Sequence, residues 1–313
     1  MHHIALADNV TRQVIDSTTV FTEFRRVRAQ AQSYGGTMYW KQEGGYEYLT
    51  KTRPRRRSQE RLGARSLQTE TIFDEYTAKK AAVELRLHSL REALTEAERL
   101  NKALKAGRTP DLVVRLLQVL DDAGLADHFV VVGTYALYAY ETAAGIRITP
   151  GALATQDVDL LRDARRRVQF VTDLKQVDSS VLGVLQRADP SFERKEGQNE
   201  TAINARGFQV DFLRRQAVEG DPHPFRFSTD EDDLWPVQAL RASVLTSAPR
   251  FEHAIISSTG KMAMMRTIAP TSFVEFKRWL ATEAPHRGAP KRRRDQLQAD
   301  IVQSMLDERL LAG

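Results

Sequence analysis

The chain has 313 residues, 42% of them hydrophobic and 28% charged, which is ordinary for a protein that buries a core. It contains no cysteine, and this excludes disulfides, thiolate zinc sites and cysteine nucleophiles. No apolar run approaches the ~18 residues that a membrane span needs. The first residues lack a basic start followed by an apolar stretch, so we expect no secretory signal and a cytoplasmic location.

The basic residues are unevenly distributed. The net charge is +5, and much of the excess lies in two runs, over 51–57 and 291–294. Such runs attract polyanions, including nucleic acid and nucleotide phosphates, although a solvated basic loop explains the pattern equally well. The candidate contacts for a nucleic-acid partner are Lys51, Arg53, Arg55, Arg56, Arg57, Lys291, Arg292, Arg293 and Arg294.

The first third of the chain predicts two helices that flank a β-hairpin. Apolar residues recur at helical spacing over 10–32. Two β-prone runs, 37–41 and 46–50, are separated by a Gly-Gly pair, which is a hairpin signature. Segment 70–105 has almost no Gly or Pro and carries an apolar stripe, so it predicts a long charged helix.

The rest of the chain mixes strand and helix signals and shows no internal repeat. We expect helices at 111–123 and 135–144, strands at 129–132, 155–161 and 207–213, short strands and helices from 232 onward, and a helical tail over 294–310. The domains that follow are 1–108, a helical region with the hairpin and the long helix; 109–230, the core; and 231–313, a mostly helical C-terminal region.

The turn after the strand at 129–132 is the first candidate for chemistry. Gly133 allows a ligand to approach the backbone closely. Thr134 offers a hydroxyl beside the free N–H groups of a helix start, where phosphates bind. Gly and Thr also cap helices, so a purely structural turn is the alternative interpretation.

Two aspartates on one strand are the second candidate. Side chains alternate along a strand, so Asp157 and Asp159 point the same way while Val158 and Leu160 face the core. Carboxylates held ~7 Å apart on one strand face repel each other and require a compensating cation. Magnesium suits them as a hard ion that takes carboxylate and phosphate oxygens. The alternative is a solvated strand edge.

Asp211 is the third candidate. It lies inside the apolar run 208–213, where a lone carboxylate should be paired or metal-bound. If this strand lies beside the strand of Asp157 and Asp159, the three carboxylates converge and could hold two divalent ions. Asp211 would then serve as general base or as ligand of the second ion.

A Gly-Ser/Thr turn after a strand, an Asp-x-Asp strand and a third Asp on a later strand together resemble the DNA polymerase β-like nucleotidyltransferase superfamily. The chain is similar in more detail to one bacterial branch, known as a nucleotidyltransferase domain family. The gap between Gly133 and Asp157 is longer than is usual for the superfamily, but the branch shares it. The similar segments, between Gly35 and Ala299, are GTMYWKQEGGYEYLTKT, VVGTYALYAYETAAG, ATQDVDLL, NARGFQVDFL, FVEFKRWL and APKRRRDQLQAD.

This resemblance implies an α+β fold, in which a polymerase β-like core of mixed sheet and helices carries helical N- and C-terminal regions. It also implies that Gly133 and Thr134 contact the nucleotide phosphates. Asp157, Asp159 and Asp211 would be the catalytic residues and the ligands of two Mg²⁺ ions.

The expected activity is therefore magnesium-dependent transfer of an NMP group from an NTP, such as ATP, to an acceptor hydroxyl. The basic runs make tRNA or another nucleic acid an attractive acceptor. A protein hydroxyl is the alternative, as in AMPylation-type enzymes of toxin–antitoxin or defence systems. A non-catalytic nucleic-acid-binding module is a second class, and the intact aspartates argue against it. An adaptor in a defence or toxin system is the third.

Several residues outside the triad have two interpretations each. Lys277 and Arg266 could bind a phosphate of the nucleotide, but Lys277 also fits a solvent-facing position on an amphipathic helix. Asn204 and Arg206 could contact base or ribose, or could form a turn. Asp295 is expected to be a structural ion-pair partner beside the basic run. The histidines show no i, i+4 pairing, so we expect no zinc site.

Overall fold

The computed structural model describes residues 3–53, 58–153, 155–162, 167–177, 179–219 and 225–311. They form two compact units, one of residues 15–100 and one of residues 1–14 together with 101–313. The smaller unit contains most of the helices α1 (Asp8–Ser33) and α2 (Leu67–Ala103). The start of α1, residues 8–14, and the end of α2, residues 101–103, belong to the larger unit.

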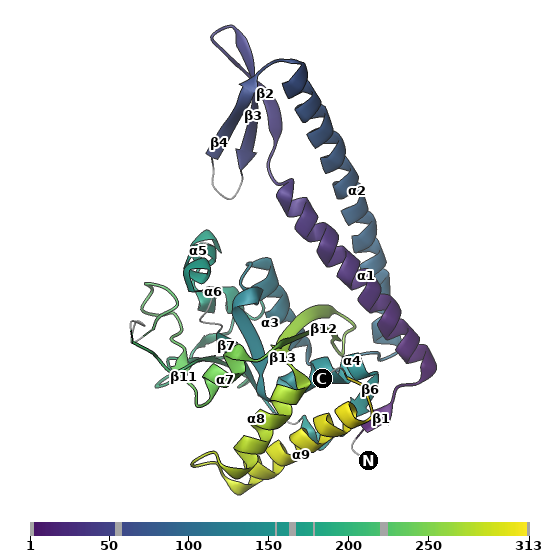
Figure 1. The fold of residues 1–313 in the computed structure, drawn as a ribbon, viewed down its shortest axis with the longest axis vertical. Helices are drawn as coiled ribbons and strands as arrows, with labels where there is room; N and C mark the ends of the chain where they lie inside the picture. Colours follow the sequence, from purple (N-terminus) through teal and green to yellow (C-terminus); the bar gives the residue numbers. More distant parts are fainter. Residues whose placement is uncertain are drawn as a thin grey trace. The chain divides into compact units, whose positions relative to one another are not determined.

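An antiparallel sheet completes the smaller unit (Figure 1). Its strands are β2 (Met38–Glu43), β3 (Tyr46–Arg53) and β4 (Ser58–Ala64), in this order. Trp40 of β2 packs on Phe73 of α2 with ring centroids 5.9 Å apart, so this face of the sheet is covered by the helix. The hairpin and both helices are confirmed. Strand β4 was not expected, because its sequence SQERLGA is polar and exposed and only backbone pairing with β3 defines it.

The larger unit is built, within the described residues, on a six-stranded mixed sheet. Across the sheet the order is β5 (Phe129–Val132), β7 (Asp157–Arg162), β10 (Gln209–Arg214), β9 (Thr201–Ile203) and β8 (Glu193–Arg194), and β11 (Val237–Gln238) pairs with β10. β7 and β10 are parallel, as are β10 and β11, while the other pairs are antiparallel.

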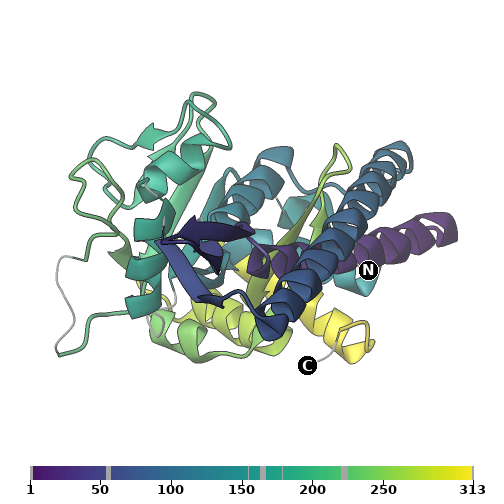
Figure 2. The same cartoon turned by 90° about the horizontal axis from the view of Figure 1, so that it is seen from above.

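Helices surround this sheet. They are α3 (Asp111–Asp122), α4 (Ala136–Ala144), α5 (Arg167–Val177), α6 (Val181–Gln186), α7 (Ala242–Ser247), α8 (Pro270–Thr282) and α9 (Ala289–Asp307). Two antiparallel strand pairs accompany them, β12 (Arg250–Ile256) with β13 (Met262–Ile268) and β1 (His3–Ala5) with β6 (Ile146–Ile148). Helices α8 and α9 lie side by side, as Figures 1 and 2 both show.

The apolar face of the sheet forms the core of the larger unit. Every residue of β5 is buried, as is Val158 of β7. Phe212 of β10 packs against Phe129 of β5 with ring centroids 5.4 Å apart. Side chains alternate along a strand. Asp157 and Asp159, which flank Val158 in β7, therefore point away from this core.

This mixture of helices and a mixed sheet confirms the α+β class. The helix expected at 135–144 is also present as α4, although a short 3₁₀ turn over Gly133–Tyr135 precedes it. No helix in the described ranges combines the length and the apolar character that crossing a bilayer requires.

Candidate metal centre

Three aspartates meet on two neighbouring parallel strands. In the register of β7 and β10, Asp159 lies opposite Asp211, and Asp157 lies two residues earlier on the same face of β7. One carboxylate oxygen from each residue lies within 4.8 Å of the other two. The adjacency of the two strands, on which the sequence-based site depended, is confirmed.

The cluster is electrostatically costly without a cation. Burial and the nearby charges of Asp157 and Asp211 raise the pKa of Asp159 to about 7. Burial also raises the pKa of Asp211, against the opposing effect of a hydrogen bond from the Thr201 hydroxyl to its Oδ1, 2.6 Å long. A divalent ion would remove this repulsion, and carboxylate oxygens are the ligands that hard cations prefer. The residues therefore fit a magnesium site.

Gly133 lies directly against this cluster. Val132, the last residue of β5, is paired with Asp159, so the chain turns beside the carboxylate. The φ angle of Gly133 is +72°, which disfavours any residue with a side chain. A Cβ at this position would lie 2.4 Å from Oδ2 of Asp159, closer than non-bonded atoms can approach. Gly133 is therefore required by its own backbone and by the position of Asp159.

Thr134 follows in the same turn and is buried. Its hydroxyl oxygen accepts a hydrogen bond, 3.1 Å long, from Nε2 of Gln298 in α9. The same Nε2 donates to the carbonyl of Ala152 at 2.7 Å. The turn that the sequence singled out is thus held in place by a helix near the C-terminus.

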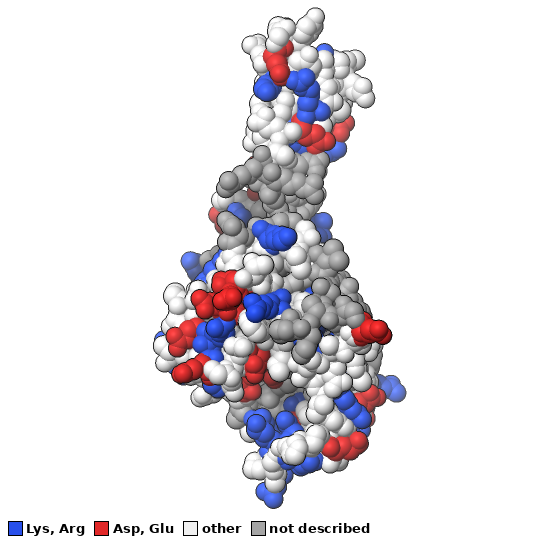
Figure 3. Space-filling model, turned by 90° about the vertical axis from the view of Figure 1, so that its left-hand side faces the viewer, with Lys and Arg blue, Asp and Glu red and all other residues white. Residues whose placement is uncertain are grey.

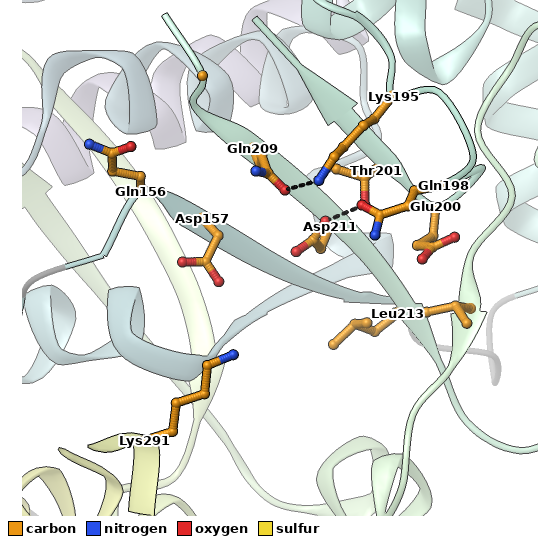
Figure 4. Close-up of a pocket in the computed structure, with 12 residues that line it drawn as sticks. Gln156, Asp157, Lys195, Gln198, Glu200, Thr201, Gln209, Asp211, Leu213 and Lys291 are labelled. Carbon is orange, nitrogen blue, oxygen red and sulfur yellow. Dashed lines mark hydrogen bonds between the residues drawn. The ribbon is translucent and has the colours of Figure 1, made fainter. Parts of the chain in front are cut away.

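A pocket of about 520 Å³ opens in front of the aspartates. Figure 4 shows Lys291 of α9 extending toward it from the side opposite β10, and Lys195 above it, where its Nζ donates to Oε1 of Gln209 at 3.2 Å. Two lysines and two carboxylates of the aspartate cluster thus line one cavity. Its lining consists of Gln156, Asp157, Lys195, Gln198, Glu200, Thr201, Gly207, Gln209, Asp211, Leu213, Val237 and Lys291.

Two other predicted phosphate contacts are engaged in ion pairs. Lys277 is only 3% exposed, and its Nζ lies 2.9 Å from Oδ1 of Asp295. The solvent-facing interpretation of Lys277 is therefore wrong. Arg266 is paired with Asp127 at 2.8 Å and with Glu252 at 2.9 Å, and it is not among the residues that line the pocket.

Asp295 is an ion-pair partner, as expected, but it does not pair with the adjacent basic run. It is fully buried, and its partners are Lys277 of α8 and Arg287 of the α8–α9 turn, whose Nε lies 2.5 Å from Oδ2. Asn204 forms a turn, because its Oδ1 accepts hydrogen bonds from the backbone N–H groups of Arg206 and Phe208.

The C-terminal basic run has more than one structural role. Arg292 donates to the carbonyls of Ala281, Thr282 and Ala284, so it caps the end of α8 and is not free for nucleic acid. Lys291 instead reaches the pocket. Figure 3 shows Lys and Arg side chains gathered at the lower end of the molecule, where Figure 1 places the turn between α8 and α9. In the N-terminal run, Arg55, Arg56 and Arg57 lie outside the described residues.

Sequence patterns gave no signal for three residues of the site. Lys195 and Thr201 belong to the short β8–β9 segment, which lacks a clear strand pattern. Gln298 sits on a helix where a polar residue suggests a solvated face, although it is fully buried. Only the pairing of β9 with β10 and the packing of α9 bring these residues to the aspartates.

One comparison with known proteins covers both the fold and the acidic site. Residues 111–312, which contain the whole sheet and the three aspartates, match the model of a family described as nucleotidyltransferase. The chain belongs to this nucleotidyltransferase family. No curated protein and no solved structure matches the chain.

Proposed function

We propose that this protein is a magnesium-dependent nucleotidyltransferase with a polymerase β-like core, and that it transfers an NMP group from an NTP to an acceptor hydroxyl. One observation carries the proposal. Asp157, Asp159 and Asp211 present three oxygens within 4.8 Å of one another beside a glycine turn, and two of them, Asp157 and Asp211, line a pocket that contains two lysines. Bound magnesium would neutralise charge on the triphosphate and activate the attacking hydroxyl.

The residues have distinct roles in this proposal. Asp157 and Asp159 would hold the ions, and Gly133 and Thr134 would contact the phosphates at the start of α4. The acceptor oxygen forms a bond to the α-phosphorus, the bond to the bridging oxygen of the β-phosphate breaks, and pyrophosphate leaves. Asp211 takes the proton of the hydroxyl as general base.

An alternative role for Asp211 is ligation of the second ion. Thr201 occupies Oδ1 of Asp211 and leaves Oδ2 available for either role. The substitution Asp211→Asn separates the two roles. If Asp211 is the base, the variant should have a lower kcat and a divalent-ion affinity near that of the wild type. A loss of ion affinity in this variant would instead identify Asp211 as a ligand.

The test is transfer from labelled nucleotide. The wild type is incubated with each α-labelled NTP, magnesium, and total cellular RNA or lysate protein, and the labelled macromolecule is identified. Label from the α-phosphate should be retained, label from the γ-phosphate should not, and Asp157→Ala/Asp159→Ala should abolish transfer. Asp74→Asn, an exposed carboxylate of α2, is the matched control. Full activity in the double variant would overturn the proposal.

The acceptor is decided by the same experiment. Labelled RNA would support the nucleic-acid acceptor that the basic runs favour. Labelled protein would support an AMPylation-type enzyme, such as those of toxin–antitoxin systems. Salt-sensitive RNA binding with no magnesium-dependent transfer would support a binding module that has the fold without the activity.

A further inference from the structure

The inner face of α9 carries polar residues where a packed helix usually carries apolar ones. Lys291, Asp295 and Gln298 stand at positions i, i+4 and i+7, so they share one face of the helix. Asp295 and Gln298 are fully buried, whereas Lys291 is exposed and lines the pocket. Burial of polar groups is unfavourable unless they are paired. The presence of Asp295 and Gln298 on this buried stripe of α9 therefore requires an explanation.

Asp295 fixes the helix in position. Its carboxylate is held by Lys277 of α8 and by Arg287 of the turn, so the charge is compensated within the protein. This buried cluster joins α8 and α9 midway between Lys291 and Gln298. These ion pairs fix α9, and with it the backbone positions of Lys291 and Gln298, relative to α8.

Gln298 determines which way the Thr134 hydroxyl points. A carbonyl only accepts hydrogen bonds, so the contact with Ala152 requires Nε2, and not Oε1, of Gln298 on that side. The second hydrogen of Nε2 then faces Thr134 Oγ1, which must act as the acceptor. The hydroxyl hydrogen of Thr134 is left to donate elsewhere. Within the described ranges, no protein acceptor takes it.

Lys291 is placed to contact the far end of a nucleotide. It extends into the pocket from the side opposite the aspartates (Figure 4), where its ammonium group would meet negative charge beyond the metal site. Lys291 is exposed, and it shares this cavity with the carboxylates of Asp157 and Asp211. A polyphosphate with bound cations has both signs of charge in the required order.

We propose that the inner face of α9 completes the triphosphate site: Lys291 binds the β- and γ-phosphates directly, and Gln298 is a positioning residue that turns the Thr134 hydroxyl toward them. This inference rests on the proposed function, because it takes the ligand to be the triphosphate of an NTP. It adds a substrate contact and a positioning residue from α9, which begins at Ala289, 127 residues after β7 ends at Arg162.

Equilibrium binding tests the direct contact. Affinities of the full chain for ATP, inorganic pyrophosphate and AMP, each with magnesium, are measured by titration calorimetry. Lys291→Ala should weaken ATP and pyrophosphate binding about tenfold, as loss of a charge-assisted hydrogen bond does, and leave AMP unchanged. Arg278→Ala, which removes an exposed cation of the neighbouring helix α8, should bind all three like the wild type. Unchanged pyrophosphate affinity in Lys291→Ala, or an equal loss for AMP, would overturn the assignment.

A double-mutant cycle tests the positioning role. Thr134→Val and Gln298→Met should each weaken pyrophosphate binding several-fold, and the double variant should be no weaker than Thr134→Val, because Gln298 acts through that hydroxyl. Thr134→Ser should retain wild-type affinity. Additive losses in the double variant would overturn the role of Gln298, and thermal melting shows whether each variant is folded.

Failure of this inference and failure of the proposed function have different signatures. Transfer activity in the wild type together with wild-type binding by Lys291→Ala would overturn only the role of α9. Weakened binding by Lys291→Ala, with no macromolecule labelled under any condition, would support the role of α9 and contradict nucleotidyl transfer. A wild-type protein that binds neither ATP nor pyrophosphate would overturn both.

Discussion

The ionised form of the Asp159 carboxylate is unfavourable unless a cation is bound beside it. Its pKa of about 7 is raised by burial first and by Asp157 and Asp211 second. A metal ion binds the ionised form, so a proton competes with the metal below this pKa. We expect the affinity for Mn²⁺, used as a spectroscopic substitute for magnesium, to fall as the pH is lowered from 8 through 7 to 6. An affinity that is constant over this range would contradict the assignment.

The same shift affects the stability of the metal-free protein. A carboxyl whose folded pKa lies above its unfolded value favours folding in its protonated form, so its contribution is lost as the pH rises through the folded pKa. At pH 8, Asp159→Asn should therefore raise the free energy of unfolding, on the order of 1 kcal/mol after allowance for solvent screening. Asp74→Asn should leave it unchanged in denaturant titrations. Destabilisation by Asp159→Asn would contradict the electrostatic account.

Gly133 offers a comparison between two glycines with similar backbones. Gly133 and Gly145 have φ angles of +72° and +65°, but only at Gly133 would a Cβ strike another group, Oδ2 of Asp159. Both alanine variants should lose about 1 kcal/mol from backbone strain. Gly133→Ala should also displace the carboxylate and weaken Mn²⁺ binding at least tenfold, whereas Gly145→Ala should not. Equal metal affinity in the two variants would contradict the contact.

At the scale of elements, the pair of helices α8 and α9 depends on one arginine of the basic run. Arg292 donates to carbonyls at and beyond the end of α8, whereas the adjacent Arg293 is exposed. Arg292→Ala should lower the free energy of unfolding by about 1–3 kcal/mol, because the carbonyls at the end of α8 lose a charged donor. Arg293→Ala removes the same charge and should cost less than about 0.5 kcal/mol. Equal losses would contradict the capping role of Arg292.

Some properties of a strand can be predicted from its own sequence, and others cannot. The alternation in β7 predicts that Asp157 and Asp159 share a face, because side-chain direction is a local property of a strand. The pairing of β7 with β10 is a long-range property that neither strand's own sequence shows. The sequence therefore predicts that Asp211 meets the other two aspartates only on the condition that these strands are neighbours. Strand β4 has no apolar pattern and could not be predicted from hydrophobic alternation.

At the scale of the whole molecule, the residues that sequence reasoning misjudged or missed have partners on other elements. Lys277 resembles a surface lysine until α9 brings Asp295 to it. Gln298 resembles a solvated residue until it meets Thr134, which precedes it by 164 positions. The family match covers these elements together, from 111 to 312, and the smaller unit of residues 15–100 lies before it.

The measurement that tests the central claim most directly is divalent-ion binding at the three aspartates. Mn²⁺ is titrated into the full chain with and without ATP and followed by electron paramagnetic resonance, in the wild type and in Asp157→Asn/Asp159→Asn. We expect ATP to increase the affinity and the number of ions held by the wild type, and the double variant to lose this response. Equal Mn²⁺ binding by both proteins in the presence of ATP would contradict a catalytic metal centre at Asp157, Asp159 and Asp211.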